Sequence, residues 1–278
     1  MSGFWGTRRP GWLFRTIAIG CLIIGMMTYV YPLAYMLFRS FLTTDPSFGT
    51  PLPPFTLEHY RLILGEAGFL QYTSNSVLVL VAVVCANLLF SLLAGYAFAR
   101  YRFPFKNFLF GIILATLMVP KQVLVVPILD VMVRLGLHDT LWALILPFAV
   151  DSFNIFLVRQ YLCSIPPDLE DAARVDGAGE LRLLWDVVFP LCRPALALVI
   201  INTAITTWNA FLFPLILTDS ARERTLPVGL AMFTQGPFST DWGALMAGSA
   251  VGSLPIIILF ILFQREIIEG ITAGAMKE

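Results

Sequence analysis

Six long, continuously apolar segments constrain this chain more than any other feature of its sequence. They cover residues 13–38, 77–99, 108–131, 141–163, 194–217 and 244–264. A helix needs about 20 apolar residues to cross the hydrocarbon core of a bilayer. Only helices and closed barrels satisfy every backbone amide and carbonyl in lipid, and segments this long and uniformly apolar are not barrel strands. The sequence therefore predicts an all-α, polytopic membrane protein with six transmembrane helices.

The composition of the chain agrees with this prediction. Of its 278 residues, 58% are hydrophobic and 13% are charged, whereas soluble domains are roughly 45–50% apolar and about 25% charged. The 18 Lys and Arg residues balance the 18 Asp and Glu residues, so no net positive charge attracts nucleic acid. These values exclude an ordinary cytosolic domain, a disordered chain and a basic protein that binds nucleic acid.

The distribution of Lys and Arg predicts which helix ends face the cytoplasm. With the amino terminus inside, 12 of the 18 basic residues lie in or near the cytoplasm and the other 6 do not. Cytoplasmic loops carry an excess of Lys and Arg. We therefore expect residues 1–12 and 265–278 to be cytoplasmic and residues 39–76, after the first span, to be extracytoplasmic. Residues 77–264 then form the core domain with the other five spans.

Two smaller features complete the outline. The amphipathic stretch 55–64 predicts a short helix at the outer membrane surface. The cysteines form no CxxC pair and no Cys/His cluster, so the sequence predicts neither a zinc site nor a disulfide framework. We expect each of them to be a small buried hydrophobic residue: Cys21, Cys85, Cys163 and Cys192.

The predicted cytoplasmic loop, residues 164–193, carries the most informative polar residues. Pro166 and Pro167 favour the start of a helix, because a proline in the first turn removes no amide that the helix needs. The helix dipole favours negative charge in that turn, and three acidic residues follow the prolines: Asp168, Glu170 and Asp171. A short helix is therefore predicted here.

Glycines end this helix and begin a second one. Gly177 and Gly179 predict a tight turn, and the amphipathic stretch 181–189 then leads to Pro190 and the fifth span. Leu169, Ala172 and Ala173 share one face of the first helix at helical spacing. A short helix with a small apolar face suits docking into a groove of a partner protein. An ordinary solvated loop is the alternative.

The residues of this loop also resemble a known motif. The stretch Asp171-Ala-Ala-x-x-Asp-Gly177, closed by Val187-x-Phe-Pro190, is similar to the EAA loop of ABC importer permeases. That loop has Glu-Ala-Ala, three residues, Gly, nine residues and Ile-x-Leu-Pro, and the spacing here is the same. Asp171, Val187 and Phe189 replace Glu, Ile and Leu with residues of the same character.

Further segments resemble the MalG-like branch of these permeases, the maltose-type carbohydrate importers. They are residues 95–103, 118–123, 207–214 and 264–277. The resemblance implies the type I (MetI-like) permease architecture in the inner membrane of a prokaryote. It also implies a transport subunit, not an enzyme, for a sugar or sugar-like solute: a sugar, an amino sugar, a polyol or glycerol-3-phosphate.

The resemblance implies the partners as well. They are a second permease subunit, a dimer of ABC ATPases beneath the membrane, an external solute-binding protein and the lipid bilayer. No cofactor is expected on this chain, and ATP and Mg belong to the partner ATPase, since the phosphate-binding pattern GxxxxGK[ST] does not occur. The residues implied in ATPase coupling are Glu170, Asp171, Ala172, Ala173, Asp176, Gly177 and Pro190, with Thr272 and Lys277 in the tail as a second contact.

Polar residues inside the spans identify a candidate solute pathway. Lys121 and Asp151 have similar predicted depths, and ionisable residues at such positions are usually functional or paired. We expect them to pair or to line an aqueous cavity; snorkelling or backbone contacts are the alternative. An unpaired Lys121 would favour an anionic solute, and pairing would cancel that preference. The other candidates are Gln122, Asn154, Asn202, Thr206, Asn209 and Trp208, whose ring could stack on a sugar.

Prolines predict where the spans bend, and small residues predict where they pack closely. Pro120, Pro127 and Pro147 are expected to kink spans three and four, which frees backbone groups toward a cavity. In span six, the small residues Ala244 and Gly248 are followed at the same spacing by Gly252. This spacing permits close helix contact, either with a partner subunit or within the chain.

Two other classes of membrane protein stay open. An ion-coupled secondary transporter would require coupling-ion residues, and only Lys121 and Asp151 carry charge deep within the spans. A membrane enzyme would require a catalytic pattern. The two histidines, His59 and His138, lie near predicted outer loops, and neither HExxH nor GxSxG occurs.

Overall fold

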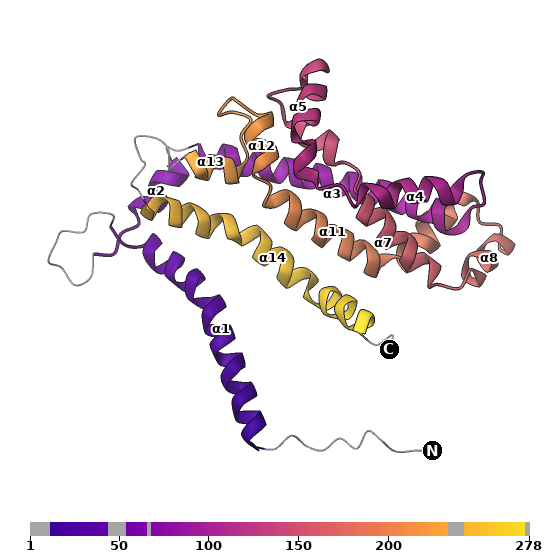
Figure 1. The fold of residues 1–278 in the computed structure, drawn as a ribbon, viewed down its shortest axis with the longest axis horizontal. Coiled ribbons are helices and arrows are strands. Elements are labelled where there is room, and N and C mark those ends of the chain that lie inside the picture. Colours follow the sequence, from indigo (N-terminus) through magenta and orange to yellow (C-terminus); the bar gives the residue numbers. More distant parts are fainter. Residues whose placement is uncertain (1–11, 44–53, 66–67, 233–241, 276–278) are drawn as a thin grey trace.

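The computed structural model describes residues 12–43, 54–65, 68–232 and 242–275, and its regular structure there is helical apart from one isolated bridge between Leu42 and Phe55. The all-α prediction is thereby confirmed. Figure 1 shows α3, α7, α11 and α14 running alongside one another, while α1 contacts α14 and diverges from the bundle toward the amino terminus. The elements are α1 (Trp12–Ser40), α2 (Glu58–Gly65), α3 (Phe69–Arg100), α4 (Lys106–Thr116), η1 (Lys121–Leu124), α5 (Val125–Arg134), α6 (Leu141–Ile145), η2 (Leu146–Phe148), α7 (Ser152–Cys163), α8 (Asp168–Val175), α9 (Glu180–Leu183), η3 (Leu184–Val188), α10 (Phe189–Leu191), α11 (Arg193–Trp208), α12 (Leu212–Leu217), α13 (Leu226–Met232) and α14 (Trp242–Ala275).

Four helical segments of the described chain are long and apolar enough to cross a membrane, and there are up to six spans if each of two bent helix pairs counts as one. The four are Trp12–Ser40, Phe69–Arg100, Leu141–Cys163 and Trp242–Gln264. The pair Lys106–Thr116 and Lys121–Arg134 is bent by 92°, and the pair Glu180–Leu191 and Arg193–Trp208 by 76°. The expected number of spans is thus compatible with the structure, but two of them are not straight helices.

Proline explains the break in the third span. A proline ring clashes with the carbonyl of the residue four positions earlier and has no amide hydrogen to bond it. Pro120 is four residues after Thr116, where α4 ends. The expected kink at Pro120 is therefore a complete break. Pro127 lies in the first turn of α5 and causes none, because the helix needs no amide donor there.

The fifth span differs from the predicted segment 194–217. Helix α11 ends at Trp208, and α12 is a separate helix from Leu212 to Leu217. A continuous helix would place the ring of Pro214 against the carbonyl of Ala210. The Asn209 side chain instead donates to the Ile205 carbonyl (2.9 Å) and satisfies one group at the helix end.

Helix α3 is the central element of the bundle, since it packs against α7, α11, α6, α13 and α2. It approaches α7 closely at Gly95. A Cβ added there would lie 2.8 Å from Val158 Cγ1 and 3.1 Å from the backbone nitrogen of Arg159. Because the backbone of α7 occupies this space, only glycine lets the two helices meet at this distance.

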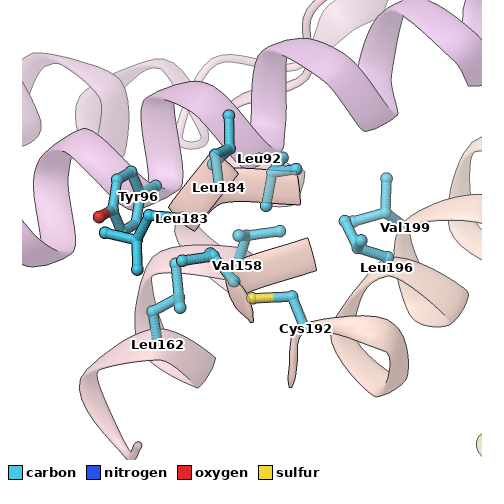
Figure 2. Close-up of a cluster of buried hydrophobic side chains, with 10 residues drawn as sticks. Leu92, Tyr96, Val158, Leu162, Leu183, Leu184, Cys192, Leu196 and Val199 are labelled. Atoms are coloured by element: carbon cyan, nitrogen blue, oxygen red, sulfur yellow. The ribbon is translucent and has the colours of Figure 1, made fainter. Parts of the chain in front are cut away.

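One apolar cluster joins α3 and α7 to the segment before the fifth span. Figure 2 shows Leu183 and Leu184 beside Leu92 and Tyr96 of α3. Its buried members are Leu92, Tyr96, Val158, Leu162, Leu183, Leu184, Val188, Cys192, Leu196 and Val199. The predicted cytoplasmic loop is thus packed against the ends of the spans and is not an independent loop.

The small residues of span six make contacts within the chain. Ala244 is fully buried, and a Cβ added at Gly248 would lie 2.4 Å from Leu230 of α13. The Trp208 indole donates to the Gly252 carbonyl (2.9 Å), which joins α11 to α14. In the structure, this stripe therefore packs inside the chain.

A polar clamp joins two loops beside α5 and α12, which pack together and project from one side of the bundle (Figure 1). The Asp139 carboxylate accepts hydrogen bonds from the backbone amides of Asp219 and Ser220, both at 2.9 Å. The Ser220 amide, together with these other donors, lowers the pKa of Asp139. Because this pKa is lowered, the clamp contributes stability above the carboxyl's ordinary pKa and loses it as the pH falls through the lowered value.

The prediction of four buried cysteines is wrong for three of them. Only Cys192 is buried, whereas Cys21, Cys85 and Cys163 are exposed. The helix sides that face lipid are as apolar as those that face the protein, so an apolar segment does not distinguish the two environments. Burial in a span depends on which side of the helix has a neighbour.

The contact at Gly95 gives a stability prediction. We expect Gly95→Ala to destabilise the protein by about 1–3 kcal/mol, because overpacking moves backbone atoms of α7. Thermal unfolding in detergent measures this as a lower Tm. The control is Gly111→Ala in α4, where no atom lies within 4 Å of the added Cβ. Equal Tm values for the two variants would contradict the close-packing argument.

Candidate functional site

The segment Asp168–Leu191, here called the elbow hairpin, has the predicted order of short helix, glycine turn and second helix. Helix α8 ends at Val175, and Gly177 follows with φ +83°. The amide of Ala178 bonds the Ala173 carbonyl and that of Gly177 bonds the Arg174 carbonyl, both at 3.0 Å. This pair of bonds is the Schellman motif, which favours glycine because that residue adopts a left-handed backbone without strain. The predicted turn at Gly177 is therefore confirmed.

Glu170, one of the residues implied in ATPase coupling, points into the protein and not toward the exposed side of α8. Its side chain is 2% exposed, and its Oε1 accepts from the Nε of Arg100 at the end of α3 (2.6 Å). Arg100 also donates through its Nη2 to the Ile165 carbonyl (3.0 Å). Helix dipole and sequence position place Glu170 in the first turn of α8, but the direction of its side chain depends on where Arg100 lies. Glu170 thus attaches α8 to α3.

A second polar link lies next to the first. Arg174 of α8 bonds Asp171 (3.1 Å) and the Tyr96 hydroxyl of α3 (3.3 Å). Its Nε lies 3.5 Å from the carboxylate of Glu180, which also accepts from the Tyr101 hydroxyl (2.5 Å). That hydrogen bond to the carboxylate raises the pKa of Tyr101, so its phenol stays protonated at neutral pH. These contacts join α8, α9 and the end of α3.

The outward side of α8 is small, apolar and acidic. Ala172, Asp171 and Asp176 are exposed, and Ala173 is half-buried against the apolar cluster. Several large apolar side chains of the elbow hairpin are also exposed: Leu169 (51%), Val175 (87%), Leu181 (76%) and Trp185 (49%).

Three other residues implied in ATPase contact lie elsewhere. Pro190 is half-buried in α10, beside the 76° bend into α11. It lies at the junction of hairpin and span, separate from the exposed side of α8. Thr272 falls in α14, and Lys277 lies outside the residues that the structure describes.

A cavity of about 730 Å³ lies among α3, α7, α11, α12 and the broken third span. This volume is within the range of small-molecule sites. Its lining includes six of the eight residues predicted for the solute pathway: Lys121, Gln122, Asp151, Asn202, Thr206 and Asn209. The span breaks surround it, as expected where irregular backbone faces a cavity and not lipid.

Lys121 and Asp151 form the ion pair that the sequence led us to expect. The Lys121 Nζ lies 2.5 Å from the Asp151 Oδ2, with side chains 61% and 19% exposed. The other oxygen of Asp151 accepts from the Phe153 amide (2.9 Å), so the residue also caps α7. Among the described residues that line the cavity, these two are the charged ones. The lining therefore has no net charge.

A ladder of buried amides supports one wall of the cavity. Asn154 donates to Asn87 (3.0 Å) and Thr203 (2.9 Å), and Asn202 donates to Asn154 (3.1 Å). Asn87 also donates to the Phe148 carbonyl (2.8 Å), which lies in η2 of the fourth span beside Pro147. Asn154 is therefore a buried cross-link between α3, α7 and α11. We did not predict Asn87, although an amide in the middle of an apolar span was a usable indication.

Trp208 does not line the cavity. Its ring is 5% exposed in a cluster with Ile63, Phe69 and Leu226, so it offers no stacking surface here. The aromatic side chains that line the cavity and are partly exposed include Phe153 (42%) and Phe211 (41%). Amides, hydroxyls and aromatic rings together can bind a solute rich in hydroxyl groups.

Comparison with known proteins gives concordant results. The family described as "Binding-protein-dependent transport system inner membrane component" matches residues 87–271. The arabinooligosaccharides transport system permease protein AraQ of Halalkalibacterium halodurans is 37% identical over 274 residues, which cover 94% of this chain and 95% of that protein. The trehalose/maltose transport system permease protein MalG of Thermococcus litoralis is 32% identical over 268 residues, which cover 94% and 96%. A chain of a bacterial ABC transporter that imports the acidic polysaccharide alginate matches in structure with a TM-score of 0.79 and 25% identity, covering 95% of this chain and 99% of that one.

The two contacts of Asp151 can be separated by substitution. Asp151→Asn keeps an oxygen that caps α7 but removes the charge, and we expect it to cost at most about 1 kcal/mol, as for an exposed ion pair. Asp151→Ala also removes the cap, which costs about 1 kcal/mol more. Unfolding in detergent measures both values. Lys121→Gln is the matched control. When it is added to Asp151→Asn, the ion pair is already lost, so the free energy of unfolding should fall no further than for a surface substitution. Equal stabilities of the Asn and Ala variants would contradict the capping role.

Proposed function

This chain belongs to the family of binding-protein-dependent transport system inner membrane components, and we propose that its importer takes up an uncharged oligosaccharide through the cavity beside Lys121 and Asp151. The chain is a permease subunit and not an enzyme. ATP is hydrolysed by a partner ATPase, and a solute-binding protein delivers the solute. The permease is a multi-pass membrane protein of a bacterial ABC importer.

The charge balance of the cavity carries the proposal about the solute. An anionic solute needs a free cation in its pathway, but Asp151 neutralises Lys121 at 2.5 Å. The amides of Gln122, Asn202 and Asn209 remain on the lining and suit the hydroxyl groups of a sugar. The AraQ and MalG relatives are named for arabinooligosaccharides and for trehalose and maltose, which are uncharged, whereas two relatives of 33% and 31% identity are named for the anionic solutes sulfoquinovosyl glycerol and sn-glycerol-3-phosphate. The proposal about the solute therefore depends on the cavity and not on these names.

The elbow hairpin is proposed as the contact with the ATPase. Its exposed surface combines the small residue Ala172 with the acidic residues Asp171 and Asp176. A small side chain permits close approach of α8 to a groove, and the exposed acids can pair with basic side chains there. Gly177 fixes the angle of the turn behind this surface. Thr272 and Lys277 remain a proposed second contact.

The proposed orientation places the elbow hairpin and both termini in the cytoplasm. Supporting it, basic residues expected inside lie together at the hairpin end of the bundle: Arg100 and Arg174 bond hairpin or span-end groups, and Arg159 lies over the Phe110 ring (4.1 Å). A second permease subunit is proposed to complete the pathway, because Lys121 is 61% exposed at the open side of the cavity.

Uptake by a reconstituted importer tests the proposed function. We expect proteoliposomes with the permeases, the ATPase and the binding protein to accumulate pentose or hexose oligosaccharides when ATP is inside. A non-hydrolysable ATP analogue should abolish uptake, and collapsing ion gradients should not. Uptake that follows an ion gradient would instead favour a secondary transporter. Preferential uptake of an anionic uronate oligosaccharide would contradict the proposed solute class.

Docking of α8 gives a second prediction. We expect Ala172→Arg to weaken association with the ATPase by at least about 30-fold, corresponding to roughly 2 kcal/mol at the centre of an interface. Co-purification and titration of the detergent-solubilised permease measure the association. Leu135→Arg is the control, since Leu135 is 61% exposed and follows α5, which lies away from α8 (Figure 1). Unchanged association of the Ala172 variant would contradict docking by this side of α8.

A further inference from the structure

We infer that Arg100 and Glu170 are positioning residues that transmit movement of the elbow hairpin to α3, and through α3 to the wall of the cavity. This inference rests on the proposed ATPase contact of the hairpin and adds the route by which its movement reaches the solute pathway. Both residues are largely buried within the chain and do not belong to the exposed side of α8.

The first step is the attachment of α8. This helix packs on η3 and α9 of its own hairpin. Among the interactions described for it, two side-chain links reach α3: Arg100 with Glu170, and Arg174 with Tyr96. The Arg100–Glu170 pair is the shorter and the more buried, at 2.6 Å with side chains 14% and 2% exposed. A displacement of α8 therefore acts on α3 through this pair.

Burial of the Arg100–Glu170 ion pair costs free energy unless the two side chains stay in contact. Burying two charges requires close geometry and further hydrogen bonds to offset the lost hydration. Arg100 has a further acceptor in the Ile165 carbonyl, whereas the Oε2 of Glu170 is buried without a partner in the described structure. Separating the two side chains would leave both charges unpaired in an apolar setting. The hairpin and the end of α3 are thus expected to move as one body.

The second step is the path from Arg100 to the cavity. Helix α3 is unbroken from Phe69 to Arg100. Four of its residues line the cavity: Ser76, Val79, Val83 and Asn87. Asn87 is 13 residues before Arg100, which is about 20 Å along a helix. Asn87 bonds Asn154, so displacement of α3 also acts on the amide ladder that crosses to α7 and α11.

The covalent path from the hairpin is less direct. It enters α11 through the π-helical turn Leu184–Val188 and then a 76° bend before Arg193. An irregular turn and a bend absorb rotation locally, because their backbone bonds are not a continuous ladder. The non-covalent connection to the straight helix α3 is therefore the stiffer of the two.

Substitution of the pair tests this route. In the reconstituted importer we expect Glu170→Gln, which keeps the size of the side chain, to lower the number of solute molecules imported per ATP hydrolysed. The expected fall is about 2- to 30-fold, the range for substitutions along a coupling network. Arg100→Lys keeps the charge but loses the planar fork that reaches two acceptors, so its ratio should fall as well. Asp130→Asn is the matched control, because Asp130 forms an exposed pair with Arg134 in α5 (2.8 Å).

The number of solute molecules imported per ATP hydrolysed distinguishes a role in transmitting movement from a role in folding or assembly alone. If uptake and ATP hydrolysis fall together in an assembled complex, the ratio is unchanged and the inference is wrong. If the wild-type complex shows no ATP-driven uptake, the proposed function fails instead.

A distance measurement with the native pair intact decides the case in which neither variant assembles. Spin labels at exposed Val175 of α8 and Phe105, next to the end of α3, report whether the two move together. We expect their separation to change by less than about 2 Å between the nucleotide-free and ATP-bound complexes, the scale of adjustments at packed interfaces. The separation of Val175 from exposed Val126 of α5 should change by more. A larger change between α8 and α3 would overturn the inference.

Discussion

A backbone inside a bilayer must satisfy its own hydrogen bonds, and the rest of this structure depends on that constraint. Long helices meet it where the chain faces lipid. The breaks at Pro120, Pro147 and Pro214 do not meet it alone, and they gather around one cavity of about 730 Å³. There Asn87 donates to the Phe148 carbonyl and Asn209 to the Ile205 carbonyl. The same irregular backbone that lipid would exclude thus provides a polar surface for a solute.

Two regions of the permease are built differently. Beside α5 and α12, backbone groups of Asp219 and Ser220 bind the Asp139 carboxylate, so the loops are held by local polar contacts. At the hairpin end, an apolar cluster and the Arg100–Glu170 pair hold the elbow hairpin to α3. Long-range attachment of this kind is expected where movement has to pass from a partner protein into the spans. In the binding-protein-dependent family ATP is hydrolysed by the partner ATPase, and we propose that this hydrolysis drives the movement.

The comparisons and the geometry address different questions. Relatives of about 32–37% identity establish the family and the class of importer. The match to a transporter of an acidic polysaccharide shows that the fold also serves a charged solute. The fold alone therefore does not determine the solute of this chain. A neutralised lysine and several amides are the features that bear on it here, and they favour an uncharged sugar.

The sequence by itself determined the helical class, the apolar segments, the glycine turn at Gly177 and the family motif, because each is a local pattern of hydrophobicity, backbone freedom or spacing. It also indicated that Lys121 and Asp151 pair or line a cavity, since two charges at similar depth in adjacent spans have few other partners, and the structure decided that they pair. It did not determine that Glu170 turns inward, that Trp208 is buried, or that Cys21 faces away from the protein. Only the tertiary structure decided these, because the side of a helix that meets a neighbour depends on residues far away in the chain, and in lipid both sides are apolar.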